Sequence, residues 1–152
     1  MVVTTRLRVS VVALFVNQGE VLLLHQMTPP EPDCWDLPGE GLEPSEDLSS
    51  GLRREVREEI GVTNFQIERL LTVAEAFYIE EENQKLHKLD IIYQCRADPK
   101  PTHFETLDEQ EIGPRGIRWI PIADLTPECC SSRVWKALQA ANWVAVKADS
   151  SQ

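Results

Sequence analysis

The sequence predicts one α/β domain over residues 1–152, with a mixed β-sheet sandwiched between α-helices. Three observations lead to this prediction: β-rich runs recur along the chain, two segments show helical apolar periodicity, and no linker or internal repeat divides the sequence. The chain has 152 residues, of which 42% are hydrophobic, and this is enough to bury a core of its own.

The first part of the chain is expected to be mainly β-strand. The predicted strands are short runs bounded by turn residues, and they cover residues 9–16, 20–25 and 35–37. The predicted connections carry Gly, Pro or acidic residues, and they cover residues 17–19, 27–33 and 40–46. Asn17-Gln18-Gly19 is a hairpin signal, so the first two strands are expected to pair with each other.

A helix is predicted from residue 48 to about residue 60. Asp47 suits the N-cap, and Gly61 suits the position that ends a helix. The helix would carry a continuous apolar stripe made of Leu48, Leu52, Val56 and Ile60. Glu59 projects into this stripe and Glu55 sits beside it. Carboxylates in such a place cost several kcal/mol of desolvation unless a cation or a strong partner compensates them.

Three glutamates of this helix, Glu55, Glu58 and Glu59, lie one helical turn apart. A hard divalent cation, Mg²⁺ or Mn²⁺, is the simplest compensator for carboxylates that converge in this way. The alternative is an ordinary acidic helix face paired with arginines at i, i+4 spacing. The position of Glu59 within the apolar stripe favours the metal site.

The second part of the chain returns to strands and ends in a helix. Long or buried strands are predicted at residues 64–79, 86–97 and 116–120, and an amphipathic helix at residues 131–142. The remaining segments are expected to be a charged turn, a polar functional loop, a short turn and a frayed tail, at residues 80–85, 98–115, 122–125 and 147–152.

Composition limits the classes of partner. The 25 acidic and 15 basic residues give a net charge of −10, which argues against nucleic acid and against an anionic membrane surface. No apolar run approaches the roughly 18–20 residues that span a bilayer, and residues 1–16 indicate a first strand in preference to a signal peptide. The four cysteines lack metal-finger spacing, so we expect reduced thiols in a cytoplasmic protein. A homodimer is left open.

Residues 40–62 resemble the signature of the Nudix (MutT-like) hydrolases, G-x(5)-E-x(7)-R-E-U-x-E-E-x-G-U with U a large aliphatic residue. The positions in register are Glu46, Arg54, Glu55, Val56, Glu58, Glu59, Gly61 and Val62. Similar stretches before and after the signature extend the resemblance, at Trp35-Asp36-Leu37-Pro38-Gly39 and at residues 118–125. Glu40 replaces the opening glycine. It would be strained at positive φ, unless the turn is rearranged or Glu40 adds a carboxylate near the metal.

The resemblance implies a Nudix fold and hydrolysis of a nucleoside diphosphate linked to a moiety X, by attack of water on phosphorus. Such a small phosphorylated substrate repels hydroxide, so cations that neutralise its oxygens and lower the pKa of the attacking water are expected. Glu55 and Glu59 can share an ion, Glu58 can hold a second ion or orient the water, and by resemblance the Gly39 carbonyl is a further ligand. The implied cofactor is Mg²⁺ or Mn²⁺.

Roles outside the metal helix are less restricted by the sequence. Arg54 is expected to reach Glu46 or a metal-binding carboxylate and to fix the geometry there. The general base is either Glu58 or an acidic residue of a late loop. Glu111 is the preferred loop residue, among Glu105, Asp108, Glu109 and Glu111. Gly51 leaves room either for substrate and ions or for local packing.

Two aromatic residues are candidates for stacking on a substrate base. Tyr78 follows the signature at a distance that resembles the diadenosine-polyphosphate hydrolases of the family, although tyrosine is also common in strands. Trp35 could stack as well, with core or rim packing as the alternative. The alternative function is a catalytically silent Nudix-fold module that senses a ligand, and the intact glutamates argue against it.

Overall fold

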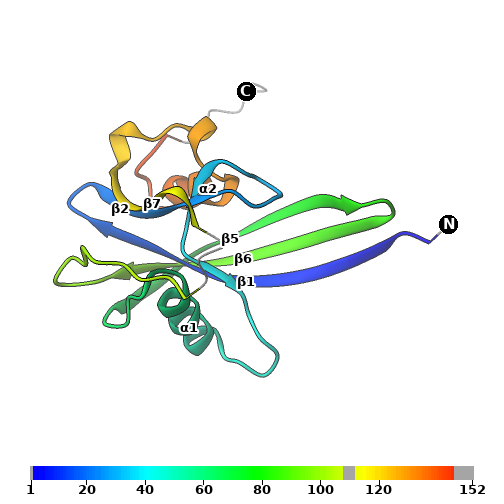
Figure 1. Cartoon of the computed structure of the whole chain (residues 1–152), viewed down its shortest axis with the longest axis horizontal. Coiled ribbons are helices and arrows are strands. Elements are labelled where there is room, and N and C mark those ends of the chain that lie inside the picture. The colour runs from blue at the N-terminus through cyan, green and yellow to red at the C-terminus, as the bar shows by residue number, and fades with distance from the viewer. Residues whose placement is uncertain (1, 108–111, 146–152) are drawn as a thin grey trace.

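The computed structural model describes residues 2–107 and 112–145 of the chain. Within this part the strands form a seven-stranded sheet in the order β3-β2-β1-β6-β5, with β4 pairing β1 and β7 pairing β2. The helices α1 and α2 lie on opposite sides of the sheet (Figure 1). The predicted fold class, a mixed sheet between helices, is confirmed. No helix in the described residues is long and apolar enough to cross a membrane.

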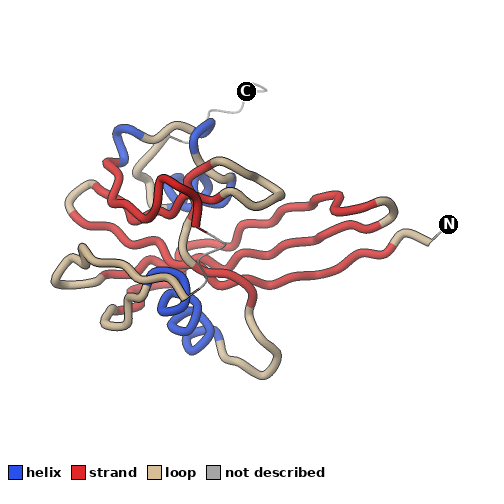
Figure 2. Tube along the Cα trace, in the orientation of Figure 1, coloured by secondary structure: helices blue, strands red, loops and turns tan. Residues whose placement is uncertain are grey.

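Figure 2 shows the trace of the chain with its strands, helices and loops in different colours. The strands are β1 (Thr4–Asn17), β2 (Glu20–Gln26), β3 (Cys34–Asp36), β4 (Gly39–Gly41), β5 (Gln66–Glu81), β6 (Gln84–Arg96) and β7 (Ile112–Pro121). The helices are α1 (Leu48–Ile60) and α2 (Ser132–Ala140), with two short 3₁₀ turns, η1 (Ile122–Asp124) and η2 (Pro127–Cys129).

The predicted first hairpin is present. Asn17 pairs with Glu20 across a two-residue turn, and both strands contain the ranges expected from the sequence. β1 begins at Thr4, earlier than predicted, because it pairs in parallel with β6 along most of its length, from Thr4–Gln84 to Phe15–Cys95. This parallel pairing makes the sheet mixed.

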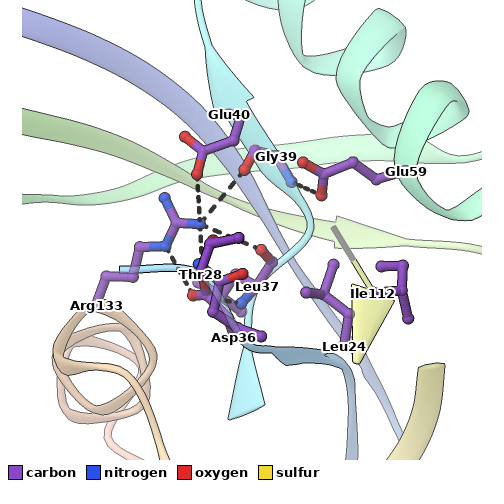
Figure 3. Close-up of a pocket in the computed structure, with 10 residues that line it drawn as sticks. Leu24, Thr28, Asp36, Leu37, Gly39, Glu40, Glu59, Ile112 and Arg133 are labelled. Carbon is purple, nitrogen blue, oxygen red and sulfur yellow. Dashed lines mark hydrogen bonds and ion pairs between the residues drawn. The ribbon is translucent and has the colours of Figure 1, made fainter. Parts of the chain in front are cut away.

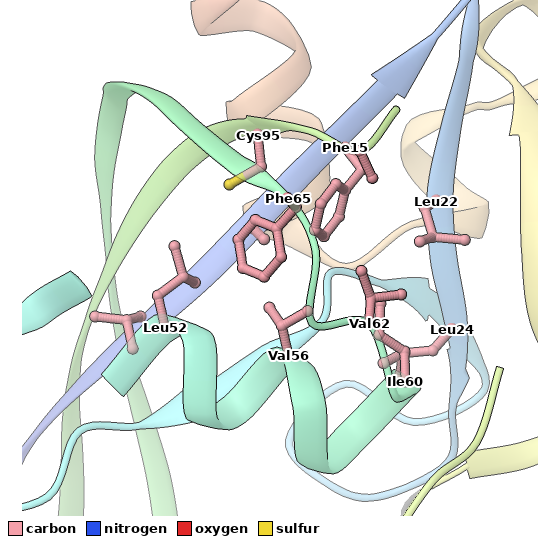
Figure 4. Close-up of a cluster of buried hydrophobic side chains, with 12 residues drawn as sticks. Phe15, Leu22, Leu24, Leu52, Val56, Ile60, Val62, Phe65 and Cys95 are labelled. Atoms are coloured by element: carbon pink, nitrogen blue, oxygen red, sulfur yellow. The ribbon is translucent and has the colours of Figure 1, made fainter. Parts of the chain in front are cut away.

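Helix α1 has the predicted bounds. Asp47 accepts a hydrogen bond from the Ser50 amide at 2.8 Å, and Gly61 ends the helix with φ of 75° in the left-handed region. The buried part of the stripe is Leu52, Val56 and Ile60, which pack with Phe15, Val62 and Phe65 in one core cluster (Figure 4). The prediction was wrong for Leu48, which is 37% exposed because it lies in the first turn, outside this cluster.

A second core cluster lies under α2 on the other side of the sheet. Its members come mainly from β1, β2, β6 and α2, with Ala74 from β5, and include Val12, Leu14, Leu23, Ile92, Val134, Ala137 and Leu138. The predicted helix at residues 131–142 is therefore confirmed, with Ser131 as N-cap and Ala141 as C-cap.

Three predicted boundaries were wrong where a loop was expected. Residues 39–41 form β4 because they pair with residues 10–12 of β1. The turn expected at residues 80–85 shrinks to residues 82 and 83, because Glu81 and Gln84 still pair. β7 begins at Ile112 rather than at Gly116, because Ile112 pairs with Gln26 after a register shift in β2. The tail at residues 147–152 lies outside the described residues.

The strands β1, β6 and β5 extend beyond the helices as a three-stranded arm (Figure 1). Register places Arg8, Lys88 and Ala76 in one row across the arm. The neighbouring residues Leu7, His87 and Phe77 form a row that points to the opposite face, because side chains alternate along a strand. The row with Arg8 and Lys88 faces the side on which α2 packs, because Ala74 and Ile92 of the same alternation belong to the α2 cluster.

Candidate functional site

Arg54 lies among the carboxylates of the predicted metal helix. Its Nε and one terminal nitrogen donate to both oxygens of Glu46, at 2.6 and 2.8 Å. The other terminal nitrogen donates to Glu55 at 2.8 Å and to Glu58 at 3.2 Å. Arg54 also donates to the Gly41 carbonyl at 3.2 Å. The predicted contact between Arg54 and Glu46 is present, and Arg54 ties the loop before α1 to the helix.

These contacts fix the charge states on the loop side of the cluster. The hydrogen bond from Arg54 lowers the pKa of the Glu46 carboxyl to about 2. Burial raises the pKa of Glu55, and the hydrogen bond and charge of Arg54 partly oppose that shift. Glu58 is the most exposed of the three helix glutamates, with 38% of its side chain accessible, so water reaches it most easily.

Glu59 lies one turn after Glu55 on α1 and is buried against the Gly39 turn (Figure 3). It accepts one hydrogen bond from the Gly39 amide at 2.9 Å. No arginine or lysine within the described residues forms a salt bridge with it. Burial raises the pKa of Glu59 well above its ordinary value of 4.5, and the Gly39 amide opposes this shift only in part. A buried carboxylate with so little compensation is the chemical signature of a site for a cation.

Glycine is the only residue type that fits at position 39 of this turn. Its φ is 126°, and a Cβ there would lie 2.2 Å from the Val11 carbonyl oxygen and 2.6 Å from Val12 Cα. The positive φ therefore falls on Gly39, and Glu40 lies in β4 without positive φ. The strain considered for Glu40 does not arise, because the turn has shifted by one residue.

Arg133 is a component of the site that the sequence reasoning missed. It donates to both oxygens of Asp36 at 2.8 and 2.9 Å, and to Asp90 at 3.0 Å. It also approaches the carbonyls of Leu37 and Gly39, each at 3.4 Å (Figure 3). Arg133 thus holds the carbonyl side of the turn whose amide binds Glu59.

The signal for Arg133 was present in the sequence. Arg133 is four residues before Ala137 and so lies on the buried face of α2, where an unpaired charge is not tolerated. Lys88 and Asp90 likewise alternate with outward residues in β6, in phase with Leu86 and Ile92. Charged residues in phase with an apolar pattern are therefore the feature that would have found this network.

The carboxylate of Glu40 is surrounded by cations. Arg8 lies 3.5 Å, Arg133 3.8 Å and Lys88 3.9 Å from its oxygens. Ser10 donates a hydrogen bond to it at 3.3 Å. We call Arg133, Asp36 and Asp90 the α2 network. Glu40 supplies negative charge between this network and the arm, at the position where the sequence signature has glycine.

A cleft of about 670 Å³ opens beside Glu40, between the arm and the loop that precedes β3. Its lining includes Arg6, Arg8, Pro30, Glu40, Tyr78 and Lys88. A smaller pocket next to it is lined by Gly39, Glu40, Glu59 and Arg133, so the cleft leads toward the carboxylates of α1. The volume is in the range of small-molecule sites.

The predicted ligands suit a hard cation by their donor atoms. In the described part of the chain, no group of three or more His, Cys, Asp or Glu side chains is arranged to hold a metal ion. Arg54 binds Glu55 and Glu58 in this arrangement, and Glu59 is turned toward Gly39. The oxygens of Glu55, Glu58 and Glu59, with the Gly39 carbonyl nearby, are nevertheless the donors that Mg²⁺ and Mn²⁺ prefer, so the residues fit by chemistry.

The other sequence candidates fall in different places. Trp35 packs against the α2 core cluster beside His25, with ring centroids 5.8 Å apart, which agrees with the packing alternative. Tyr78 lines the cleft and donates a hydrogen bond to Glu31 at 3.1 Å. Gly51 faces Leu42 and Glu46, where a Cβ would clash, so local packing accounts for this glycine.

Glu111 lies outside the described residues, as do Asp108 and Glu109. The loop that leads to them is anchored at the end of α1. The Glu105 amide donates to the Ile60 carbonyl at 3.1 Å, and the Leu107 amide donates to the Glu58 carbonyl at 2.7 Å. The late loop thus approaches the metal helix, as the prediction for the general base requires.

Comparisons with known proteins agree with this geometry. A family model described as the NUDIX domain matches residues 4–141. The structure is similar to a MutT NUDIX hydrolase from Burkholderia pseudomallei, with 25% identity, coverage of 89% of this chain and 98% of that chain, and a TM-score of 0.70.

Two further structures are similar at lower identity. A MutT protein from Methanosarcina mazei Go1 has 23% identity, coverage of 90% and 94% of the two chains, and a TM-score of 0.69. The NUDIX domain of Shewanella oneidensis NrtR, solved in complex with ADP ribose, has 16% identity, coverage of 92% and 88%, and a TM-score of 0.66. The search of curated proteins gave no match.

Proposed function

Since the chain belongs to the NUDIX family and is a hydrolase acting on phosphoric anhydrides, we propose that it cleaves nucleoside diphosphates linked to a second moiety X, with Mg²⁺ or Mn²⁺. The observation that supports this proposal best is Glu59, a buried carboxylate with a single hydrogen bond at 2.9 Å and a raised pKa. A cation beside it would offset the cost of burying its charge.

The metal would be held by Glu55, Glu58 and Glu59, with the Gly39 carbonyl as a further ligand. When bound, it would neutralise phosphate oxygens and lower the pKa of the attacking water. Arg54 holds Glu55 and Glu58 in place through the hydrogen bonds described above, and Glu46 in turn orients Arg54. Arg133 and the Glu59 carboxylate together fix the Gly39 turn.

In the proposed reaction the water oxygen forms a bond to one phosphorus of the diphosphate, and the bond from that phosphorus to the bridging oxygen breaks. The proton of the water passes to a carboxylate, and the bridging oxygen leaves with the other phosphate. Glu58 is the base candidate within the described residues, because it is the most exposed helix glutamate. Glu111, outside the described residues, remains the alternative base; Leu107, four positions before it, donates to the Glu58 carbonyl.

The remainder of the substrate would lie in the cleft beside Tyr78. The NrtR domain with bound ADP ribose supports a nucleoside diphosphate linked to a sugar as one ligand of this fold. Tyr78 is the candidate for stacking on a base, and Trp35 is the weaker candidate because it packs in the core.

The test is hydrolysis by the purified protein of nucleoside triphosphates, dinucleoside polyphosphates, ADP-ribose, nucleotide sugars and NADH, each with Mg²⁺ or Mn²⁺. Glu59→Gln keeps the size of the side chain and removes its charge, so we expect turnover to fall by a factor of 100 or more, on the order of 3 kcal/mol. Glu68→Gln, on the exposed side of β5, is the matched control and should keep wild-type turnover.

Full activity of Glu59→Gln on every hydrolysed compound would show that Glu59 has no role in catalysis. Binding of ADP-ribose without hydrolysis of any compound would instead favour the silent ligand-sensing module. For Glu58→Gln, a fall in turnover with metal affinity retained would favour a base role over a ligand role.

A further inference from the structure

We propose that Arg8 and Lys88 form a subsite for a phosphate group carried by X, so that the preferred substrates have an anionic X rather than a neutral sugar. This inference rests on the proposed function and concerns the end of the cleft away from the hydrolysed diphosphate. The two residues are direct neighbours on β1 and β6 and point to the same side of the sheet.

Lys88 is a largely buried cation that forms two ion pairs and no hydrogen bond within the described residues. It is 9% exposed, yet its ammonium lies 3.6 Å from Asp90 and 3.9 Å from Glu40. Both distances are too long for hydrogen bonds, and no hydrogen bond from this ammonium to another described residue is present. An ammonium has three donors, so Lys88 keeps hydrogen-bonding capacity for a ligand that enters the cleft. The cleft that Lys88 lines is where an acceptor would come from.

Arg8 contributes a second cation from the neighbouring strand β1, and its side chain is more exposed than that of Lys88. Its guanidinium lies 3.5 Å from Glu40, forms no hydrogen bond within the described residues and lines the same cleft. Arg6, one row further out, differs because it donates to Glu80 at 2.6 Å. Two adjacent cations without hydrogen-bonded partners repel each other, and a phosphate between them would bind a planar guanidinium and a compact ammonium at once.

Glu40 acts as an internal counter-anion for this subsite. It is the nearest negative charge to Arg8, and it also faces Lys88 and Arg133. All three guanidinium nitrogens of Arg133 already donate to Asp36 or Asp90, so few of its donors remain for a ligand. A phosphate entering the subsite would therefore compete with Glu40 for Arg8 and Lys88. Removal of the Glu40 charge should strengthen binding, and removal of either cation should weaken it.

The experiment compares two compounds that share adenosine diphosphate. In adenosine 5′-tetraphosphate the group X is a diphosphate, and in ADP-ribose it is a neutral sugar. We expect the ratio of kcat/KM for the tetraphosphate to that for ADP-ribose to fall at least tenfold in Arg8→Gln and in Lys88→Gln, and to rise in Glu40→Gln. Lys85→Gln removes the same charge from β6 on the opposite side of the sheet, and its ratio should equal that of the wild type.

Calorimetric binding of the tetraphosphate in EDTA gives a readout that does not depend on turnover. Its affinity should fall in the same two variants, rise in Glu40→Gln and stay constant in Lys85→Gln. Inorganic phosphate is titrated alongside. If phosphate alone binds as tightly as the tetraphosphate and loses affinity equally in the variants, the subsite serves free phosphate and the assignment to X is overturned.

The two proposals fail in different ways. If both compounds are hydrolysed and neither Arg8→Gln nor Glu40→Gln changes the ratio or the affinity, the subsite is overturned and the hydrolase stands. If neither compound is hydrolysed, the binding measurements alone decide the subsite. Arg8 is 39% exposed in its side chain, so its variant is expected to fold even if Lys88→Gln does not, which thermal denaturation checks.

Discussion

Two arginines organise the ionic groups on the two sides of the Gly39 turn, and their surroundings differ in one respect. Arg133 binds both oxygens of Asp36 and one of Asp90; a second cation, Lys88, lies 3.6 Å from Asp90, and Ser131 donates to Asp36 at 2.7 Å. Arg54 is outnumbered, because Glu46, Glu55 and Glu58 all share its one charge. Glu59, beyond its reach, has only an amide partner.

The difference separates a structural network from a candidate catalytic one. Burial alone would raise the pKa of Asp36, but the charge and hydrogen bonds of Arg133 outweigh it, and the pKa of this carboxyl is lowered. For Glu59 burial prevails and the pKa is raised. Carboxylates that are neutralised by neighbouring side-chain cations need no bound metal ion, whereas a network with surplus buried acid has a place for a cation.

The largest expected effect on stability comes from substituting Arg133. Arg133→Met leaves Asp36 and Asp90 buried without their cation, so the free energy of unfolding should fall by roughly 3–5 kcal/mol, measured by urea denaturation. Arg57→Met, on the exposed side of α1, should change stability by less than about 0.5 kcal/mol. A similar small loss for both variants would show that the α2 network is not structural.

The α1 side can be tested where the late loop docks on it. Gly61→Ala places a Cβ 2.8 Å from the Glu105 carbonyl oxygen at a φ of 75°, so we expect a loss of roughly 1–2 kcal/mol and lower turnover as the loop moves. Gly116→Ala is the matched control, because Gly116 has φ of 73° but its Cβ would meet nothing within 4 Å. Equal losses in the two variants would mean that the backbone conformation alone is responsible and that the loop contact is unimportant.

The smallest effect concerns pH in metal-free protein. Glu59 has a folded pKa above its ordinary value of 4.5, so the folded state keeps a proton that the unfolded state loses as pH rises above 4.5, and stability falls there. Asp36 has the opposite sign, because its pKa lies below 3.8 and its contribution is lost only as pH falls through the folded value.

Glu59→Gln should therefore flatten the decline of stability above pH 4.5 and be more stable than the wild type at pH 8 by about 1 kcal/mol. Added Mg²⁺ should stabilise the wild type and not the variant, as followed by thermal denaturation with and without EDTA. A wild-type stability that does not change between pH 5 and pH 8 without metal would contradict the assignment of Glu59 as a poorly compensated acid.

The elements that could be predicted are those with local signals. Asp47 and Gly61 fix the two ends of α1 through their own backbone and side-chain preferences, so no knowledge of the rest of the chain was needed. The contact of Arg54 with Glu46 followed from the position of both in one signature. β4 and the start of β7 were not predicted as strands, because they pair with residues of β1 and β2 that are distant in sequence.

The part of the site that could not be predicted is the part built by tertiary contact. Asp36, Asp90 and Arg133 come from three elements that are distant in sequence, and their contacts form only in the folded chain. The cations around Glu40 are similar, because Arg8 and Lys88 become neighbours only through the parallel pairing of β1 with β6. Sequence periodicity shows that such residues face inward, but it does not show which of them meet.

Residue 39 has a consequence for anyone who wishes to redesign this protein. Its amide serves one helix and its carbonyl the other, and the neighbouring main chain leaves no space for even a methyl group. Position 39 therefore accepts only glycine, whereas the exposed residues that line the cleft can be substituted more easily. Attempts to change the ligand specificity of the enzyme should alter residues of the arm and Glu40, and should keep Gly39.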